Sequence, residues 1–168
     1  MAITLADSYY LKALDLYPYE LEQVTEALNY AIGYDDEHAG AHCLLGMVKM
    51  YQLGNYIAAE NHYEKALASD INHVETHYAY SDLLIQTSEY GKAKKLIKHA
   101  YKIKGINVLR LKHNEGLIAE ISGDLLKAKN YMKYAYENSY RKNERQFLKE
   151  ELSRIKSKLK SKNKSNKK

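Results

Sequence analysis

The sequence lacks tryptophan and contains only one proline, one phenylalanine and one cysteine among its 168 residues. So little proline, together with only eight glycines, argues against a loop-rich or all-β fold. The lone cysteine, Cys43, cannot form an internal disulfide, which favours a reducing compartment. Residues 1–7 carry neither the basic nor the apolar segment of a signal peptide, and no stretch approaches the roughly 18 apolar residues of a membrane span. These absences predict a cytoplasmic protein.

The net charge of +5 conceals two halves of opposite sign. Residues 1–73 contain 3 lysines and 11 acidic residues, a net charge of −8, whereas residues 74–168 contain 23 basic and 10 acidic residues, a net charge of +13. Residues 153–168 alone have eight basic residues and no acidic one. The high isoelectric point therefore reflects a charge gradient and a basic tail, not a uniformly basic domain.

An apolar motif recurs along the chain at a nearly constant interval. In each copy a larger residue lies between two smaller ones on one helix face, and the copies are Val24/Leu28/Ala31, Ala59/Tyr63/Ala66, Ala93/Ile97/Ala100 and Ala128/Met132/Ala135. Successive copies are offset by 35, 34 and 35 residues. Small residues also recur every 35 positions, at Gly46, Ser81 and Gly116. A period of this size is typical of a helical solenoid, in which each repeat packs on its neighbours.

Turn and cap residues divide the chain into pairs of helices. Pro18 ends the first helix, Asn55 is suited to cap the helix with the second copy of the motif, and Gly105 is a C-terminal stop for a helix over 90–104. The repeats are predicted at about residues 5–38, 39–73, 74–108 and 109–142, followed by a capping helix over 143–160 and a basic, disordered tail over 161–168. The second repeat contains one extra residue, which leaves the phase of its first helix open.

Paired helices of about 34 residues with this arrangement of small and large side chains resemble tetratricopeptide repeats. The resemblance covers residues 5–142, and its hallmarks are Leu45-Gly46, Gly54-Asn55-Tyr56, Ala59, Tyr63 and Ala66 in the second repeat, and Glu115-Gly116, Gly123-Asp124, Ala128 and Ala135 in the fourth. It implies an all-α fold, a right-handed α/α superhelix. The sequence departs from the family where a large aromatic is expected early in each first helix, and carries there Ser8, His42, His77 and Lys112.

Two histidine pairs are the strongest candidates for bound metal. His38/His42 and His73/His77 are spaced four residues apart, as metal ligands on one helix face can be. However, no third ligand falls at a characteristic spacing and each pair spans a turn, so we interpret His42 and His77 as packing residues. Cys43 and His42 are neighbours that point about 100° apart on a helix, so they do not form a nucleophile and base. With no glycine-rich phosphate loop or paired-carboxylate motif, the sequence predicts no enzyme, no cofactor and no metal.

The positions that correspond to the concave face of the family's first helices are candidates for partner binding. The resemblance places there Tyr9, Tyr17, Cys43, Met47, Met50, Tyr51, Tyr78, Asp82, Gln86, Arg110, His113 and Leu117. Tyrosine, methionine and arginine are enriched at binding hot spots, and the chain has 17 tyrosines. We therefore predict a non-enzymatic scaffold that binds a peptide or a helix of another protein in the concave groove. The alternative is that some of these side chains only pack between first helices.

Other functions remain open at this stage. A branch of the family grips chaperone tails with lysine and asparagine, and only Arg110 and Asn114 resemble half of that clamp. The size and architecture also resemble secretion chaperones that cradle an extended segment of their cargo. The lysine-rich tail suits nucleic acid or an anionic membrane surface, although no aromatic residue is interleaved to stack bases. The opposite charges of the two halves also permit weak self-association.

Overall fold

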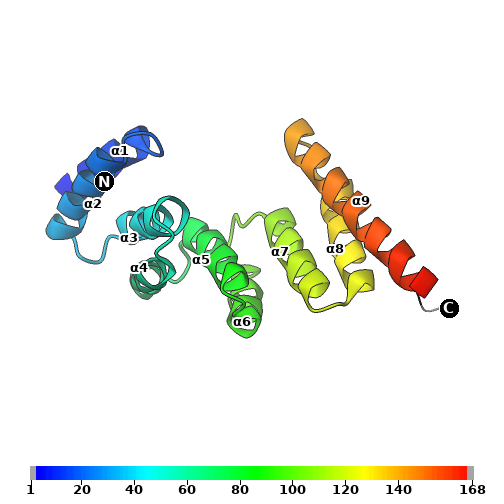
Figure 1. The fold of residues 1–168 in the computed structure, drawn as a ribbon. Helices are drawn as coiled ribbons and strands as arrows, with labels where there is room; N and C mark the ends of the chain where they lie inside the picture. Colours follow the sequence, from blue (N-terminus) through cyan, green and yellow to red (C-terminus); the bar gives the residue numbers. More distant parts are fainter. Residues whose placement is uncertain (1–2, 166–168) are drawn as a thin grey trace. The chain divides into compact units, whose positions relative to one another are not determined.

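The described part of the chain is entirely helical, as predicted. The computed structural model describes the backbone of residues 3–165, where it contains no β-strand. In chain order the elements are α1 (Leu5–Leu16), α2 (Leu21–Tyr34), α3 (Ala39–Met47), the π-helix η1 (Val48–Gln52), α4 (Tyr56–Ser69), α5 (Val74–Gln86), α6 (Tyr90–Ala100), α7 (Val108–Ile121), α8 (Leu125–Asn138) and α9 (Lys142–Ser165) (Figure 1). Within this described stretch, none of the helices is both long and apolar enough to cross a membrane.

The helices group into two compact units. Unit 1, residues 1–88, contains α1 to α5 with η1, and unit 2, residues 89–168, contains α6 to α9. The boundary falls between α5 and α6, the two helices of the third predicted repeat. Unit 1 has a core between α1, α2 and α3 that includes Ala13, Leu28 and Leu44. Unit 2 has a core between α8 and α9 that includes Met132 and Ile155.

The recurring motif supplies the buried face of every second helix. Its twelve side chains, in α2, α4, α6 and α8, are at most 1% exposed. Burial of a large side chain between two smaller ones lets each second helix approach its neighbours closely.

The recurring glycines explain why the first helices need small residues. A Cβ atom added to Gly46 in α3 would lie 2.6 Å from the Tyr63 ring of α4. The same atom added to Gly116 in α7 would lie 2.9 Å from the terminal methyl of Met132 in α8. Each glycine therefore faces the large residue of its own repeat, and the two helices pair at a distance that excludes a β-carbon.

Most helix ends follow the local sequence. The Asn55 side chain accepts a hydrogen bond from the amide of Ala58 (3.1 Å) and so caps α4 as expected. The end of α6 differs from the prediction, because this helix stops at Ala100 and not near residue 104. The backbone beyond it tightens, with the amide of Lys102 donating to the carbonyl three residues earlier (2.9 Å). Gly105, with φ of +85°, lies in the loop before α7.

The last helix, α9, covers the apolar side of α8. Leu148, Leu152 and Ile155 are buried in one cluster with the α8 residues Ala128, Met132 and Ala135. Leu152 and Ile155 thus pack on α8, and the capping role of this helix stays a prediction. Leu126, in the first turn of α8, is 66% exposed, because the repeat motif and not this turn faces α9. The helix continues to Ser165, five residues beyond the predicted end, and residues 166–168 lie outside the described part.

Ion pairs also join α9 to α7. Arg154 donates two hydrogen bonds to the carboxylate of Glu120, and Lys158 lies 2.8 Å from the same carboxylate. The Glu120 side chain is only 6% exposed. Burial raises the pKa of this carboxyl group, but the bonds to Arg154 and Lys158 outweigh burial and lower it overall. The carboxylate thus stays charged and ties α9 to the last repeat.

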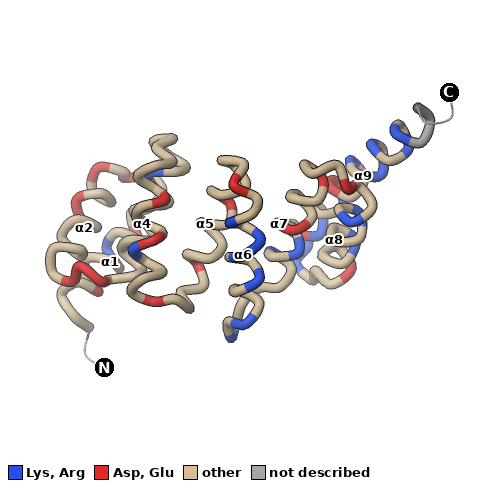
Figure 2. The backbone as a smooth tube through the Cα atoms, turned by 90° about the horizontal axis from the view of Figure 1, so that it is seen from below, with Lys and Arg blue, Asp and Glu red and all other residues tan. Residues whose placement is uncertain are grey.

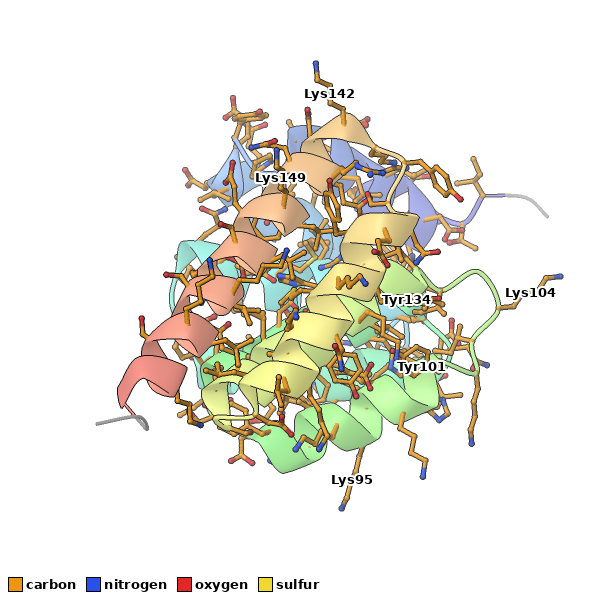
Figure 3. The ribbon with its side chains drawn as sticks, turned by 90° about the vertical axis from the view of Figure 1, so that its right-hand side faces the viewer. Lys95, Tyr101, Lys104, Tyr134, Lys142 and Lys149 are labelled. Carbon is orange, nitrogen blue, oxygen red and sulfur yellow. The ribbon has the colours of Figure 1, made fainter. Side chains whose placement is uncertain are left out.

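The division into units separates most of the charge. Unit 1 contains 3 lysines and 13 acidic residues, whereas unit 2 contains 23 basic and 8 acidic residues. Figure 2 shows red positions spread over α1 to α5 and blue positions concentrated from α6 onward. Many of the lysines of unit 2 point into solvent, as Lys95, Lys104 and Lys142 do in Figure 3.

Candidate functional site

In unit 1 the first helices of successive repeats contact one another. The helix α3 contacts α1 before it and α5 after it, so side chains from three repeats meet along one row of helices. Nine of the twelve predicted binding residues, those from Tyr9 to Gln86, lie on these three helices, directly after α1 (Tyr17) or in η1 (Met50 and Tyr51).

The π-helix η1 accommodates the extra residue of the second repeat. The amide of Leu53 donates to the carbonyl of Val48, five residues earlier (3.2 Å). A π-helix takes up one more residue per turn than an α-helix and often occurs at functional positions. In this turn Met50 faces inward and is 4% exposed, whereas the next residue, Tyr51, is 48% exposed. The burial of Met50 and the exposure of Tyr51 thus fix the phase of the first helix of the second repeat, which the sequence alone left open.

Several of the predicted residues gather around the buried Tyr63. Burial raises the pKa of its phenol far above the usual value, and the nearby Tyr51, Cys43, Asp82 and Tyr17 raise it further. The Tyr63 hydroxyl points at the Met50 sulfur (3.7 Å), and the Tyr51 hydroxyl donates to Asp82 Oδ2 across the two repeats (3.4 Å). The structure therefore brings predicted residues of three repeats together.

Three of the predicted residues are buried and present little surface to a partner. Cys43, Met50 and Tyr78 are 2%, 4% and 5% exposed, because they fill the space between the packed helices of unit 1. The expectation that they line a groove is corrected by this burial, and the alternative of packing between helices describes them better. The remaining predicted side chains of unit 1 except Tyr9 are half-buried or exposed, and they form what we call the first-helix surface: Tyr17, Met47, Tyr51, Asp82 and Gln86.

Tyr9 lies apart from the first-helix surface. Its ring stacks on Tyr30 and Tyr34 of α2, with centroid distances of 5.1 and 5.7 Å. Both partner rings are about half exposed. Tyr9 thus belongs to a tyrosine cluster on the side of α2. The sequence did not predict this cluster, because Tyr30 and Tyr34 lie on a second helix and outside the recurring motif.

The histidine pairs serve the turns between repeats. Nδ1 of His38 and of His73 accepts the amide of Ala41 and of Thr76, which caps α3 and α5. Nε2 of His42 lies 2.9 Å from the carbonyl oxygen of Asp36, and Nε2 of His77 lies 2.8 Å from that of Ile71. Each histidine at the family's aromatic position therefore closes the preceding turn.

His42 also contacts a third histidine. Because a carbonyl only accepts, Nε2 of His42 carries a proton, and Nδ1 of His42 shares a hydrogen bond with Nδ1 of His62 (3.1 Å). Burial lowers the pKa of His62 to about 4, and the proximity of His42 contributes to this shift. His62 is thus neutral at physiological pH.

In unit 2 the predicted residues lie on α7. Arg110, His113 and Leu117 are half-buried, and the His113 ring contacts the Phe147 ring of α9 (5.3 Å). Asn114, which together with Arg110 resembles half of the chaperone-tail clamp, is 2% exposed. Its burial removes it from any carboxylate that a partner offers at the surface.

Lys112 occupies the aromatic position of the fourth repeat and is held by aromatic rings. Its ammonium lies 4.9 Å from the ring centre of Tyr101 and 5.0 Å from that of Tyr131, and it pairs with Glu115 at 2.8 Å. Burial lowers the pKa of Lys112, but the bonds to Glu115 and Tyr101 outweigh burial and raise it overall. Burial, followed by a hydrogen bond to Glu115, raises the pKa of Tyr101 to about 12. The lysine therefore remains charged between the helices.

Comparison with known proteins identifies the repeat. Residues 39–72 match the family described as tetratricopeptide repeat. Over these residues the chain is similar to a tetratricopeptide repeat. The match covers α3, η1 and α4, including Gly46 and its contact with Tyr63. No curated protein matches this chain.

Solved structures show the same fold over nearly the whole chain. PilF of Pseudomonas aeruginosa is 22% identical, with a TM-score of 0.78 over 94% of this chain and 70% of that chain. PilW, a type IV pilus biogenesis factor, is 12% identical, with a TM-score of 0.76 over 93% and 80%. MamA from Desulfovibrio magneticus is 16% identical, with a TM-score of 0.68 over 95% and 98%. At these identities the likeness concerns the fold, and it confirms the all-α helical-repeat architecture.

Proposed function

We propose that this protein is a non-enzymatic scaffold that binds a peptide or helical segment of another protein on the first-helix surface. The observation that carries the proposal is the half-exposed Tyr51, whose hydroxyl bonds Asp82 of the neighbouring repeat. A tyrosine held in place by its neighbour offers a large amphipathic contact at little cost in conformational entropy. The helical-repeat fold supports a general role in protein interaction.

The first-helix surface combines apolar and polar groups in a way that suits a peptide. Met47 is half-buried beside the core of unit 1 and adapts to apolar side chains. Gln86 is exposed and donates to the Tyr56 hydroxyl (2.8 Å). Unit 1 has a net charge of −10, so a segment flanked by basic residues would associate faster than a neutral one.

Affinity capture with the full chain tests this proposal. Wild-type protein, Tyr51→Ala and Gln86→Ala are immobilised, and the proteins that they retain from native lysate are identified and then measured individually. Tyr19→Ala is the matched control, because Tyr19 is 87% exposed in unit 1 but lies outside the first-helix surface. We expect Tyr51→Ala to increase the dissociation rate about tenfold or more and Tyr19→Ala to leave it unchanged.

The basic tail provides the opposing outcome. A variant with glutamine at Lys160, Lys162, Lys164, Lys167 and Lys168 keeps the buried side chains of α9 and removes five charges. If this variant loses the partner while Tyr51→Ala retains it, binding resides in the tail. That result, with a steep dependence on salt, would indicate contact with nucleic acid or an anionic membrane and refute the scaffold proposal.

The cytoplasmic location stays a prediction.

A further inference from the structure

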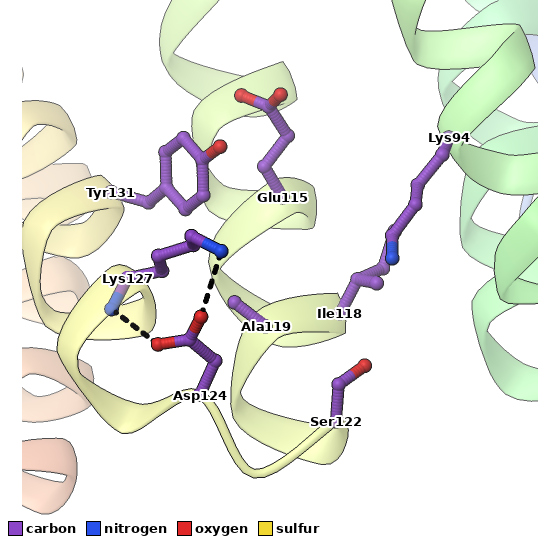
Figure 4. A pocket seen from close by; sticks show the side chains of 8 residues that line it. All are labelled: Lys94, Glu115, Ile118, Ala119, Ser122, Asp124, Lys127 and Tyr131. Carbon is purple, nitrogen blue, oxygen red and sulfur yellow. Dashed lines mark hydrogen bonds and ion pairs between the residues drawn. The ribbon is translucent and has the colours of Figure 1, made fainter.

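Unit 2 contains a pocket that lies outside the first-helix surface. The pocket has a volume of about 450 Å³, within the range of small-molecule sites. Ile118 and Ala119 of α7 contribute its apolar floor, with α6 on one side and α8 on the other (Figure 4). Its full lining is Lys94, Glu115, Ile118, Ala119, Ser122, Asp124, Lys127 and Tyr131.

Two lysines reach toward the floor from opposite sides. Figure 4 shows Lys94 extending from α6 and Lys127 from α8, with α7 between them. Lys127 pairs with Asp124 at 2.9 Å, but both side chains are well exposed, so the pair is readily exchanged for another anion. Among the described residues, no hydrogen bond or ion pair involves the Lys94 ammonium. The pocket therefore has one uncommitted cation and a second that a ligand can share.

The carboxylate of Glu115, another lining residue of the pocket, does not repel a bound anion. Glu115 Oε2 accepts both the Lys112 ammonium (2.8 Å) and the Tyr101 hydroxyl (2.7 Å). Its charge is thereby balanced inside the protein. With Lys94 and Lys127 against Asp124, the rest of the lining has a net positive charge.

We propose that this pocket binds an amphipathic anion, a single carboxylate or sulfonate on a short apolar stem. The anionic group lies between Lys94 and Lys127, and the Ser122 hydroxyl is a further hydrogen-bond donor in the lining. The stem covers Ile118 and Ala119, and the Tyr131 side chain bounds the far end. This site involves other helices and another chemistry than the peptide surface of unit 1, so it does not depend on the proposed scaffold function.

The probe for the test is 8-anilinonaphthalene-1-sulfonate, an aromatic sulfonate whose fluorescence rises in an apolar site. It is titrated into full-length wild type, Lys94→Gln, Lys95→Gln and Ala119→Leu. Lys95 is the matched control, because it lies next to Lys94 on α6, carries the same charge and points away from the pocket into solvent (Figure 3). Ala119→Leu fills the floor without altering charge. Circular dichroism verifies that each variant is folded.

We expect Lys94→Gln to weaken probe binding about three- to fivefold, the change that one partly exposed ion pair gives, and Lys95→Gln to change it less than twofold. Ala119→Leu should weaken binding further, and the amide resonances of Ala119, Ser122 and Lys127 should shift when the probe is added. Equal effects of Lys94→Gln and Lys95→Gln, or shifts confined to other residues, overturn the proposal.

Competition separates two sources of the anion. 4-Phenylbutyrate represents a free small acid, and the acetylated and amidated tripeptide Leu-Glu-Leu represents an acidic side chain of a partner protein. Displacement of the probe by 4-phenylbutyrate alone assigns the pocket to small acids, and displacement by the peptide assigns it to a protein side chain. If neither displaces the probe, the pocket does not recognise a carboxylate and the proposal fails.

Discussion

Replacement of Gly46 by alanine measures how closely the helices of a repeat are packed. The added Cβ atom would lie 2.6 Å from Tyr63 Cε1 and 2.8 Å from its Cδ1, where van der Waals contact requires at least 3.4 Å. The ring has no room to retreat, because Tyr63 is fully buried, contacts the Tyr80 ring at 5.7 Å and bonds the Met50 sulfur. Overpacking of this kind costs about 1–3 kcal/mol, whereas alanine gains up to about 1 kcal/mol over glycine within a helix. We expect a net loss of about 1–2 kcal/mol.

Gly33→Ala is the matched control in the same unit. A Cβ atom there meets nothing within 4 Å, so only the helix propensity changes and the protein should gain about 0.5–1 kcal/mol. Urea unfolding followed by far-ultraviolet circular dichroism suits a protein without tryptophan. If Gly46→Ala proves as stable as Gly33→Ala, the two helices are not held at the distance described and the argument from Tyr63 is wrong.

Three further predictions concern stability. Ala128→Leu should overpack the contact between α8 and α9 and cost about 1–3 kcal/mol, and a variant that melts like wild type would contradict the assigned face of α8. Arg154→Ala should cost about 1–2 kcal/mol because the poorly exposed Glu120 carboxylate loses its main partner, whereas the solvent-facing Lys156→Ala should be neutral in the same melts. The unfolded chain protonates His62 near pH 6.5 and the folded chain only near pH 4. The free energy of unfolding should therefore fall by about 1–2 kcal/mol as the pH is lowered from 6.5 to 4, a figure reduced because the His62 side chain is partly exposed to solvent. That decrease should be smaller in His62→Gln, and an equal slope in both proteins would refute the assignment.

The sequence was sufficient to predict the helix pairs and their core. The repeating motif marked the buried face of the second helices, since its twelve side chains depend only on local periodicity and the distance between helices. The small residues at Gly46 and Gly116 could be recognised from their spacing, because each faces the large side chain of its own repeat. Signals of this kind involve residues within about 20 positions of each other.

The sequence could not predict features that depend on a shift of one residue in helix phase, or on contacts with residues of other helices. The burial of Met50 followed from the extra residue in η1, which shifts all later side chains of that helix by one position. Lys112 was recognised as a departure from the family, but its place between two rings depends on Tyr101 and Tyr131 in neighbouring helices. The candidate site was therefore predicted as a set of first-helix positions, and the structure decided which of them reach the surface.

The π-helix η1 has a consequence for how this protein can change during evolution. One residue turns a helix by about 100°, so a single deletion within residues 48–52 would restore a regular helix and exchange which side chains face outward. The core motif of α4 begins beyond this segment at Ala59 and would stay in place. Insertions and deletions of one residue at this point would thus replace the outward-facing side chains of this segment in one step, without substitution of any residue in the core motif of α4.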